Sequence, residues 1–235
     1  MDCEAIVLAG GLGTRLRSRL PHTPKVLAPI QGRPFLGYLL AYLRGQKIHR
    51  VFLSLGYKAD QVTSWLKQNH FSPMNVIPVV EPQPLGTGGA MAYAWRHITA
   101  ECVLVLNGDT FFPISIADFY AFHLSQNVPL SIAMAYVQPA DRYGLVETLD
   151  KKVQAFREKS PAPAGWIYGG IALIEAKWWL SRSWPESFSW ESFLMQAVPA
   201  LPIGAYAAEN VPFIDIGVPE DYERAQTLIP AYASF

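Results

Sequence analysis

The chain has 235 residues, a length that suits one large domain with a hydrophobic core of its own. Hydrophobic residues make up 51% of it and charged residues only 16%, which excludes an intrinsically disordered protein. Nineteen Lys and Arg residues balance nineteen Asp and Glu residues, so the formal net charge is zero. We therefore expect no binding of nucleic acid and no binding of an anionic membrane through overall charge.

The N-terminus and the two cysteines predict a cytoplasmic protein. The opening sequence, MDCEAIVLAGG, carries acids where a signal peptide would carry positive charge. No apolar run approaches the roughly 20 residues that cross a bilayer. Cys3 and Cys102 each begin an apolar run, which is typical of buried, unpaired thiols in a reducing compartment.

The first half of the chain alternates apolar runs with amphipathic stretches. The runs that suit strands buried on both faces are residues 5–9, 51–55, 76–80 and 103–106. The helical stretches are residues 35–43, 60–67, 89–97 and 117–124. This alternation predicts a Rossmann-like α/β fold, a mainly parallel mixed sheet flanked by helices, with a ligand crevice at the carboxyl ends of its strands. Because Pro78 has no N–H group, the strand that contains it is expected at an edge or with a local irregularity.

The second half of the chain has strands that follow one another closely. These runs are residues 143–148, 153–158 and 166–174, with a loop at residues 161–164 and helical patterns at residues 189–200 and 219–228. They predict a smaller β-rich part that belongs to the same single domain, residues 1–235.

A glycine-rich loop follows the first predicted strand, in the sequence LAGGLGTRL at residues 8–16. Its glycines let backbone N–H groups approach a polyphosphate without Cβ clashes; they are Gly10, Gly11 and Gly13. Arg15 and Lys25 add positive charge nearby. Leu16 stands where a dinucleotide-binding motif has glycine, and no Gly-Lys-Ser/Thr follows for a P-loop. Phosphate binding is favoured over the alternative, a tight turn with surface charges.

Six further motifs lie along the chain in a fixed order. They are PLGTGGA at 84–90, LNGDT at 106–110, RYG at 142–144, EK at 158–159, YGG at 168–170 and FIDIG at 213–217. Together with the glycine-rich loop they resemble the sugar-phosphate nucleotidyltransferases, over nearly the whole chain. The resemblance implies the nucleotide-diphospho-sugar transferase fold. It also implies an enzyme that joins an NTP and a sugar 1-phosphate, with residues 1–136 mainly binding nucleotide and residues 137–235 mainly binding sugar phosphate.

The resemblance also implies which residues contact the nucleotide. They are Leu8, Ala9, Gly10, Gly11, Gly13, Thr14, Arg15, Glu81, Gly86, Thr87, Gly88, Asn107 and Gly108. A carboxylate at Glu81 can accept from both N1–H and the N2 amino group of guanine, whereas uracil offers one N3–H donor. This favours GTP as a hypothesis; the alternative is that Glu81 is a solvated charge at a strand end.

On the sugar side the resemblance implies a second set of residues. They are Tyr143, Gly144, Glu158, Lys159, Tyr168, Gly169 and Gly170. Glu158 can accept from sugar hydroxyls while Lys159 reaches the sugar phosphate. The alternatives are a bulge at Gly144, a surface ion pair at residues 158–159, and close strand packing at the paired glycines. Relatives often have asparagine where this chain has Tyr168, which leaves the identity of the sugar open.

Two aspartates are implied as ligands of the cofactor Mg²⁺, Asp109 after the fourth predicted strand and Asp215 far along the chain. Their alternatives are a turn residue in Asn-Gly-Asp and a helix-entry residue. Arg15, Lys25 and Asp109 are the implied catalytic residues. A sugar phosphate is already a nucleophile, so attack on the nucleotide α-phosphorus needs charge neutralisation and alignment rather than a general base.

Within the family, the chain is most similar to guanylyltransferases that act on D-glycero-α-D-manno-heptose 1-phosphate. The motifs that carry this similarity are GRPFL, PLGTGGA, LNGDTFF and FIDIG. The expected substrates are therefore GTP and that sugar phosphate, for envelope polysaccharide, in a monomer or homodimer. One alternative is a uridylyltransferase that acts on N-acetylmuramate 1-phosphate or a hexose 1-phosphate. Another is a noncatalytic regulatory subunit that binds a sugar nucleotide.

Overall fold

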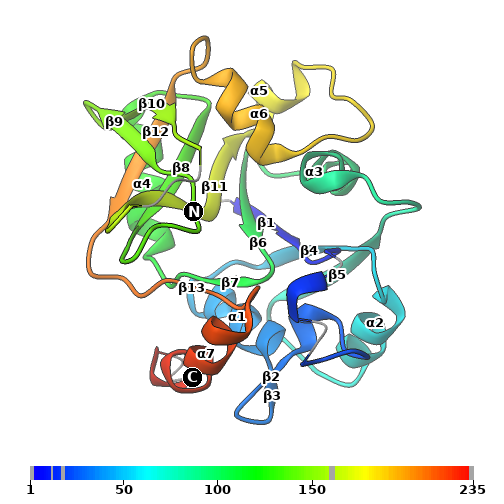
Figure 1. Cartoon of the computed structure of the whole chain (residues 1–235). Helices are drawn as coiled ribbons and strands as arrows, with labels where there is room; N and C mark the ends of the chain where they lie inside the picture. Colours follow the sequence, from blue (N-terminus) through cyan, green and yellow to red (C-terminus); the bar gives the residue numbers. More distant parts are fainter. Residues whose placement is uncertain (1–2, 12, 17–18, 159–161, 233–235) are drawn as a thin grey trace.

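The computed structural model describes residues 3–11, 13–16, 19–158 and 162–232, and nine strands of this part form one sheet (Figure 1). The sheet has the order β5-β4-β1-β6-β11-β8-β12-β10-β9. Its strands are β1 (Cys3–Leu8), β4 (Arg50–Leu55), β5 (Asn75–Val80), β6 (Cys102–Asn107), β8 (Leu130–Val137), β9 (Val146–Leu149), β10 (Lys152–Phe156), β11 (Gly165–Glu175) and β12 (Ile203–Ala208).

Helices and short strands complete the described part of the chain. The helices are α1 (Phe35–Gly45), α2 (Ala59–Lys67), α3 (Gly86–Trp95), α4 (Ile116–Gln126), α5 (Ala176–Leu180), α6 (Trp190–Ala197) and α7 (Pro219–Tyr232), with the 3₁₀ turns η1 (Thr14–Leu16) and η2 (Lys25–Leu27). Two small antiparallel pairs join β2 (Pro29–Ile30) to β3 (Arg33–Pro34), and β7 (Thr110–Phe111) to β13 (Ile214–Asp215).

The strand directions confirm the predicted fold class. Strands β5, β4, β1 and β6 are parallel neighbours, β11 runs antiparallel between β6 and β8, and β8 is parallel to β12. The carboxyl ends of the four parallel strands therefore meet at one edge of the sheet. The strand that contains Pro78 lies at the edge of the sheet, as expected for a residue without an N–H group.

The core lies on both faces of the sheet because neighbouring residues of each central strand point to opposite sides. In β1, Ala5 and Val7 pack into one hydrophobic cluster and Ile6 into the other. Helices α1, α2, α4 and α7 bury side chains in the first cluster, and α3, α5 and α6 bury theirs in the second. In Figure 1 these two groups of helices flank the sheet, which is the layered arrangement that the sequence predicts.

The second half of the chain extends the same sheet rather than forming one of its own. Strand β11 connects the halves, because it pairs with β6 on one side and β8 on the other. Strands β8 and β12 were not predicted from the sequence. Their segments, LSIAMAYV and IGAYAA, intersperse serine, glycine and alanine among the larger apolar residues, so neither forms the continuous run of large apolar residues that indicated the other strands.

The two cysteines are buried and free, as predicted. Cys3 and Cys102 are register partners on neighbouring parallel strands. In the described part of the chain no helix combines the length and the apolar character that crossing a membrane requires.

His123 is a buried histidine in α4 whose ring Nδ1 lies 2.8 Å from Ser131 Oγ in β8. Burial lowers the pKa of this ring from 6.5 to about 4. Because the folded state keeps the ring neutral, the unfolded chain binds more protons below pH 6.5. The contribution of the neutral ring to the free energy of unfolding is therefore fully present above pH 6.5 and is lost as the pH falls toward 4.

We expect the His123→Gln variant to be less sensitive to acid than the parent protein. Between pH 7.5 and 4.5 its free energy of unfolding should fall by about 2–3 kcal/mol less, since glutamine takes up no proton. Urea unfolding at the two pH values measures this difference. An equal fall in both proteins would contradict the assignment.

Candidate active site

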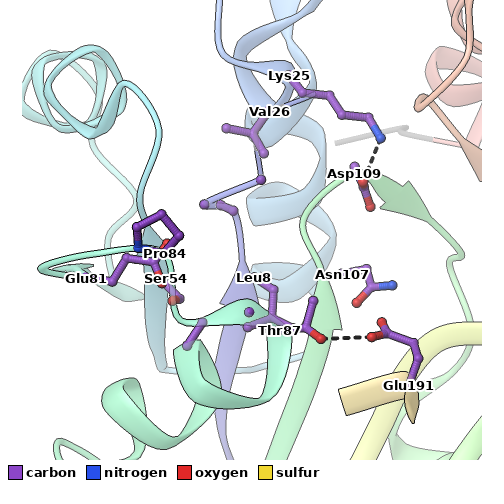
Figure 2. A pocket seen from close by; sticks show the side chains of 15 residues that line it. Leu8, Lys25, Val26, Ser54, Glu81, Pro84, Thr87, Asn107, Asp109 and Glu191 are labelled. Atoms are coloured by element: carbon purple, nitrogen blue, oxygen red, sulfur yellow. Dashed lines mark hydrogen bonds and ion pairs between the residues drawn. The ribbon is translucent and has the colours of Figure 1, made fainter. Parts of the chain in front are cut away.

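Two cavities meet at the carboxyl edge of the parallel strands. The first has a volume of about 350 Å³ and lies between the ends of β1, β4 and β6 and the start of α3 (Figure 2). The second has a volume of about 630 Å³ and lies beside β11. Asn107, Asp109 and Glu191 line both cavities, so two ligands bound in them would meet at these side chains.

Lys25 joins the two aspartates that the sequence singled out. Its Nζ lies 2.6 Å from Asp109 Oδ2 and 3.2 Å from Asp215 Oδ1. The lysine side chain is only 11% exposed, whereas those of Asp109 and Asp215 are 38% and 24% exposed. One ammonium group therefore bridges two carboxylates that remain accessible from the cavities.

The pairing of β7 with β13 brings these aspartates together across the chain. Asp215 is opposite Thr110 in this pair, and the N–H of Ile216 donates to the carbonyl of Asp109 at 3.0 Å. The N–H of Gly217 also donates to Asp215 Oδ1 at 2.7 Å, which holds that carboxylate in place. A Cβ atom at Gly217 would lie 2.7 Å from Lys25 Nζ, so a side chain there would displace the ammonium group from its present position.

Most of the predicted nucleotide-binding residues line the first cavity. They are Leu8, Ala9, Gly10, Gly11, Glu81, Gly86, Thr87 and Asn107. Arg15 instead lines the second cavity, together with both aspartates. Thr14 is the first residue of η1. Gly13 has a φ of +58°, and a Cβ atom at this position would lie 3.1 Å from the Cβ of Lys25.

Gly108 and Gly88 allow neighbouring segments of the chain to pack closely. A Cβ at Gly108 would lie 2.6 Å from the carbonyl oxygen of Leu8, so glycine lets the ends of β6 and β1 approach. A Cβ at Gly88 would lie 2.1 Å from the ring of Phe188, and the Gly88 N–H donates to the Phe188 carbonyl at 2.9 Å. Neither glycine is among the residues that line the two cavities.

Glu81 follows β5 and lines the far end of the first cavity, where Figure 2 shows it beside Ser54 and Pro84. Its Oε2 accepts from the N–H of Leu85 at 3.3 Å. Burial raises the pKa of Glu81, and the bond from Leu85 opposes this shift. A Cβ at Gly56 would lie 2.2 Å from Oε1, so a glycine that sequence reasoning did not single out makes room for this carboxylate.

Most of the predicted sugar-side residues line the second cavity. They are Tyr143, Gly144, Glu158, Tyr168 and Gly170. Gly169 instead packs against Phe112, whose ring atoms would lie 2.6 Å from a Cβ at that position. Lys159 lies outside the described residues. Burial raises the pKa of Tyr143 to about 12, and Arg142 and Asp215 modify that shift in opposite directions, so its hydroxyl is a neutral donor at pH 7.

Glu191 is a site residue that the sequence did not reveal. It lies in the first turn of α6, and its Oε2 accepts from the Thr87 hydroxyl at 2.8 Å. The two residues are 104 positions apart. An acidic residue in a first helical turn is usual, so only the tertiary contact distinguishes Glu191 from an ordinary helix-terminal charge.

Residues 4–228 match the model of a protein family described as nucleotidyl transferase. This chain belongs to that family. Among the curated relatives, the D-glycero-alpha-D-manno-heptose 1-phosphate guanylyltransferase of Aneurinibacillus thermoaerophilus is 38% identical over 97% of this chain and 99% of its own length. The protein of the same name from Campylobacter jejuni is also 38% identical, over 93% of this chain and 96% of its own.

A solved structure of this nucleotidyltransferase family has the same fold. HddC from Yersinia pseudotuberculosis superposes with a TM-score of 0.84 and is 34% identical, over 96% of this chain and 98% of its own. The same protein has been solved in complex with GMP-PN, with a TM-score of 0.83. The resemblance noted in the sequence is thereby confirmed at the level of the family, and so is the assignment of the chain as an enzyme.

Proposed function

We propose that this nucleotidyltransferase joins GTP and D-glycero-α-D-manno-heptose 1-phosphate to give the GDP-sugar and pyrophosphate. The meeting of two cavities at Asp109, with Lys25 beside it, is the observation that carries the proposal. The first cavity would hold the nucleotide and the second the sugar 1-phosphate. The names and full-length similarity of the guanylyltransferase relatives support this choice of substrates.

The proposed reaction is a single in-line displacement. An oxygen of the sugar 1-phosphate forms a bond to the α-phosphorus of GTP, while the bond from that phosphorus to the bridging oxygen breaks and pyrophosphate leaves. Both substrates are anions, so the main obstacle is their mutual repulsion. Lys25 and Arg15, which lie along the two cavities, would neutralise phosphate charge and align the reacting groups.

Asp109 and Asp215 fit a Mg²⁺ ion that is held by two carboxylates and by substrate phosphates. Their oxygens already share one cation, the ammonium group of Lys25. When bound there, Mg²⁺ would supply positive charge to the phosphate oxygens. Lys25 would then be free to donate hydrogen bonds to phosphate instead of to the carboxylates.

Glu81 is the residue that we propose to recognise the base of the nucleotide. Its carboxylate lines the end of the first cavity away from the aspartates, and Oε2 is oriented by the N–H of Leu85. An ionised carboxylate can accept from both guanine donors, N1–H and the N2 amino group, but from only one uracil donor. This supports GTP over UTP.

We expect pyrophosphate release, measured across four NTPs and a panel of sugar 1-phosphates, to be confined to GTP with the manno-heptose substrate. The panel includes mannose, glucose and N-acetylmuramate 1-phosphates. Asp109→Asn should lower the rate about 100-fold or more, because charge neutralisation at the phosphates is lost. Asp60→Asn, an exposed site in α2 outside both cavities, is the matched control.

Turnover with UTP and N-acetylmuramate or a hexose 1-phosphate would overturn the choice of substrates and keep the reaction. Absence of turnover with every pair, while GTP still binds, would instead favour a noncatalytic sugar-nucleotide-binding protein.

A second prediction concerns the base. Glu81→Gln should lower kcat/KM about 10-fold or more for GTP and less than about 3-fold for UTP, because the glutamine amide presents a donor toward the guanine donors. Steady-state kinetics with both nucleotides measures the two ratios. Equal losses for GTP and UTP would show that Glu81 does not read the base.

A third prediction concerns the shared cation. Lys25→Met should bind Mn²⁺ about 10-fold more tightly than the parent in the absence of nucleotide, because the ammonium group no longer competes for the carboxylates. Electron paramagnetic resonance of free Mn²⁺ measures this affinity. Arg15→Met is the control, since Arg15 lines the second cavity but no described contact joins it to either aspartate. An unchanged or weaker affinity in Lys25→Met would contradict the competition.

A further inference from the structure

Glu191 presents a fixed carboxylate at the point where the two cavities meet. The Thr87 hydroxyl donates to its Oε2 at 2.8 Å, and the Ser189 hydroxyl lies 3.2 Å from the same oxygen. Figure 2 shows Glu191 and Thr87 joined across the cavity, with Asn107 beside them. The other oxygen, Oε1, makes no hydrogen bond with any described residue, so it remains available to a ligand.

The charge of Glu191 restricts which part of a ligand can lie against it. No Lys or Arg forms an ion pair with it among the described residues; its stabilising partners are the two hydroxyls and the N-terminal turn of α6. An unpaired carboxylate repels phosphate groups and accepts hydrogen bonds from neutral donors. The ligand group that it fits is therefore a hydroxyl, not a phosphate.

Tyr168 lies near this carboxylate on the sugar side. It belongs to β11 and lines only the second cavity, whereas Glu191 lines both. Burial and the nearby charge of Glu191 raise the pKa of Tyr168, an interaction with Trp190 opposes this shift, and the phenol stays protonated. A neutral phenol both donates and accepts, which complements a carboxylate that only accepts.

We infer that Glu191 and Tyr168 together recognise ring hydroxyls of the sugar. This inference rests on the proposed function and extends it to the specificity of the second cavity. The carboxylate accepts from one hydroxyl, and the phenol bonds to the same hydroxyl or its neighbour. Because Tyr168 is absent from the first cavity, the hydroxyls belong to the sugar phosphate rather than to the nucleotide ribose.

Isothermal titration with GDP and with GDP-mannose tests this inference without requiring turnover, since mannose shares the ring configuration of manno-heptose. The parent protein should bind GDP-mannose more tightly than GDP. Glu191→Gln should reduce that ratio about 5- to 20-fold and change the Kd for GDP less than 2-fold. Tyr168→Phe should reduce the ratio by a smaller factor in the same direction.

Glu186→Gln is the matched control, because Glu186 lies in the loop before α6, accepts a hydrogen bond from Gln83 and lines neither cavity. The ratio of its affinities for GDP-mannose and GDP should equal that of the parent protein. In steady-state assays, Glu191→Gln should raise KM for the sugar 1-phosphate and leave KM for the nucleotide unchanged.

Three outcomes would overturn the inference. Equal weakening of GDP and GDP-mannose by Glu191→Gln would mean that the carboxylate faces the nucleotide. An unchanged ratio, with a lowered melting temperature, would mean that Glu191 only ties α6 to α3. A parent protein without preference for GDP-mannose would lack the sugar contacts altogether. Failure of the proposed function has a different result: no pyrophosphate release, whatever the binding ratio.

Discussion

The ion-pair bridge from Asp109 through Lys25 to Asp215 is the interaction on which the rest of the site depends. Each carboxylate would repel the other at this separation if no cation stood between them. The β7–β13 ladder and the bond from the Ile216 N–H to the Asp109 carbonyl set the backbone positions of the pair. The positive charge turns a repulsive arrangement into a stable one and leaves both carboxylates exposed to the cavities.

The fold was largely predictable because its central strands are continuous apolar runs. Strands β1, β4 and β6 are buried on both faces, and the edge strand β5 is partly buried, so their hydrophobicity is visible without knowledge of their neighbours. Strands β8 and β12 were not predicted because small residues interrupt their larger apolar residues. Such a segment has no period that distinguishes strand from helix, so only the completed sheet identifies it.

The site was predictable where a local motif carries the chemistry. The glycine-rich loop, the aspartate after β6 and the Asp215 motif all lie at the cavities where the sequence indicated a ligand. The structural roles of two residues could not be predicted from a local motif. Gly88 has a place in a family motif, but its described contact is with Phe188 in a loop 100 residues away. Glu191 has no motif that separates it from a helix-terminal charge, and only its bond to Thr87 reveals it.

The bridge also contributes to the net charge at the junction of the two cavities. One ammonium and two carboxylates sum to a single negative charge; Glu191 adds a negative charge nearby, and Arg15 adds a positive one in the second cavity. The junction therefore carries no excess of positive charge, and its side chains exert little net attraction on a free phosphate ion. Much of the positive charge that the reacting phosphates need would therefore have to arrive with the substrates, as a divalent cation bound to them would bring it.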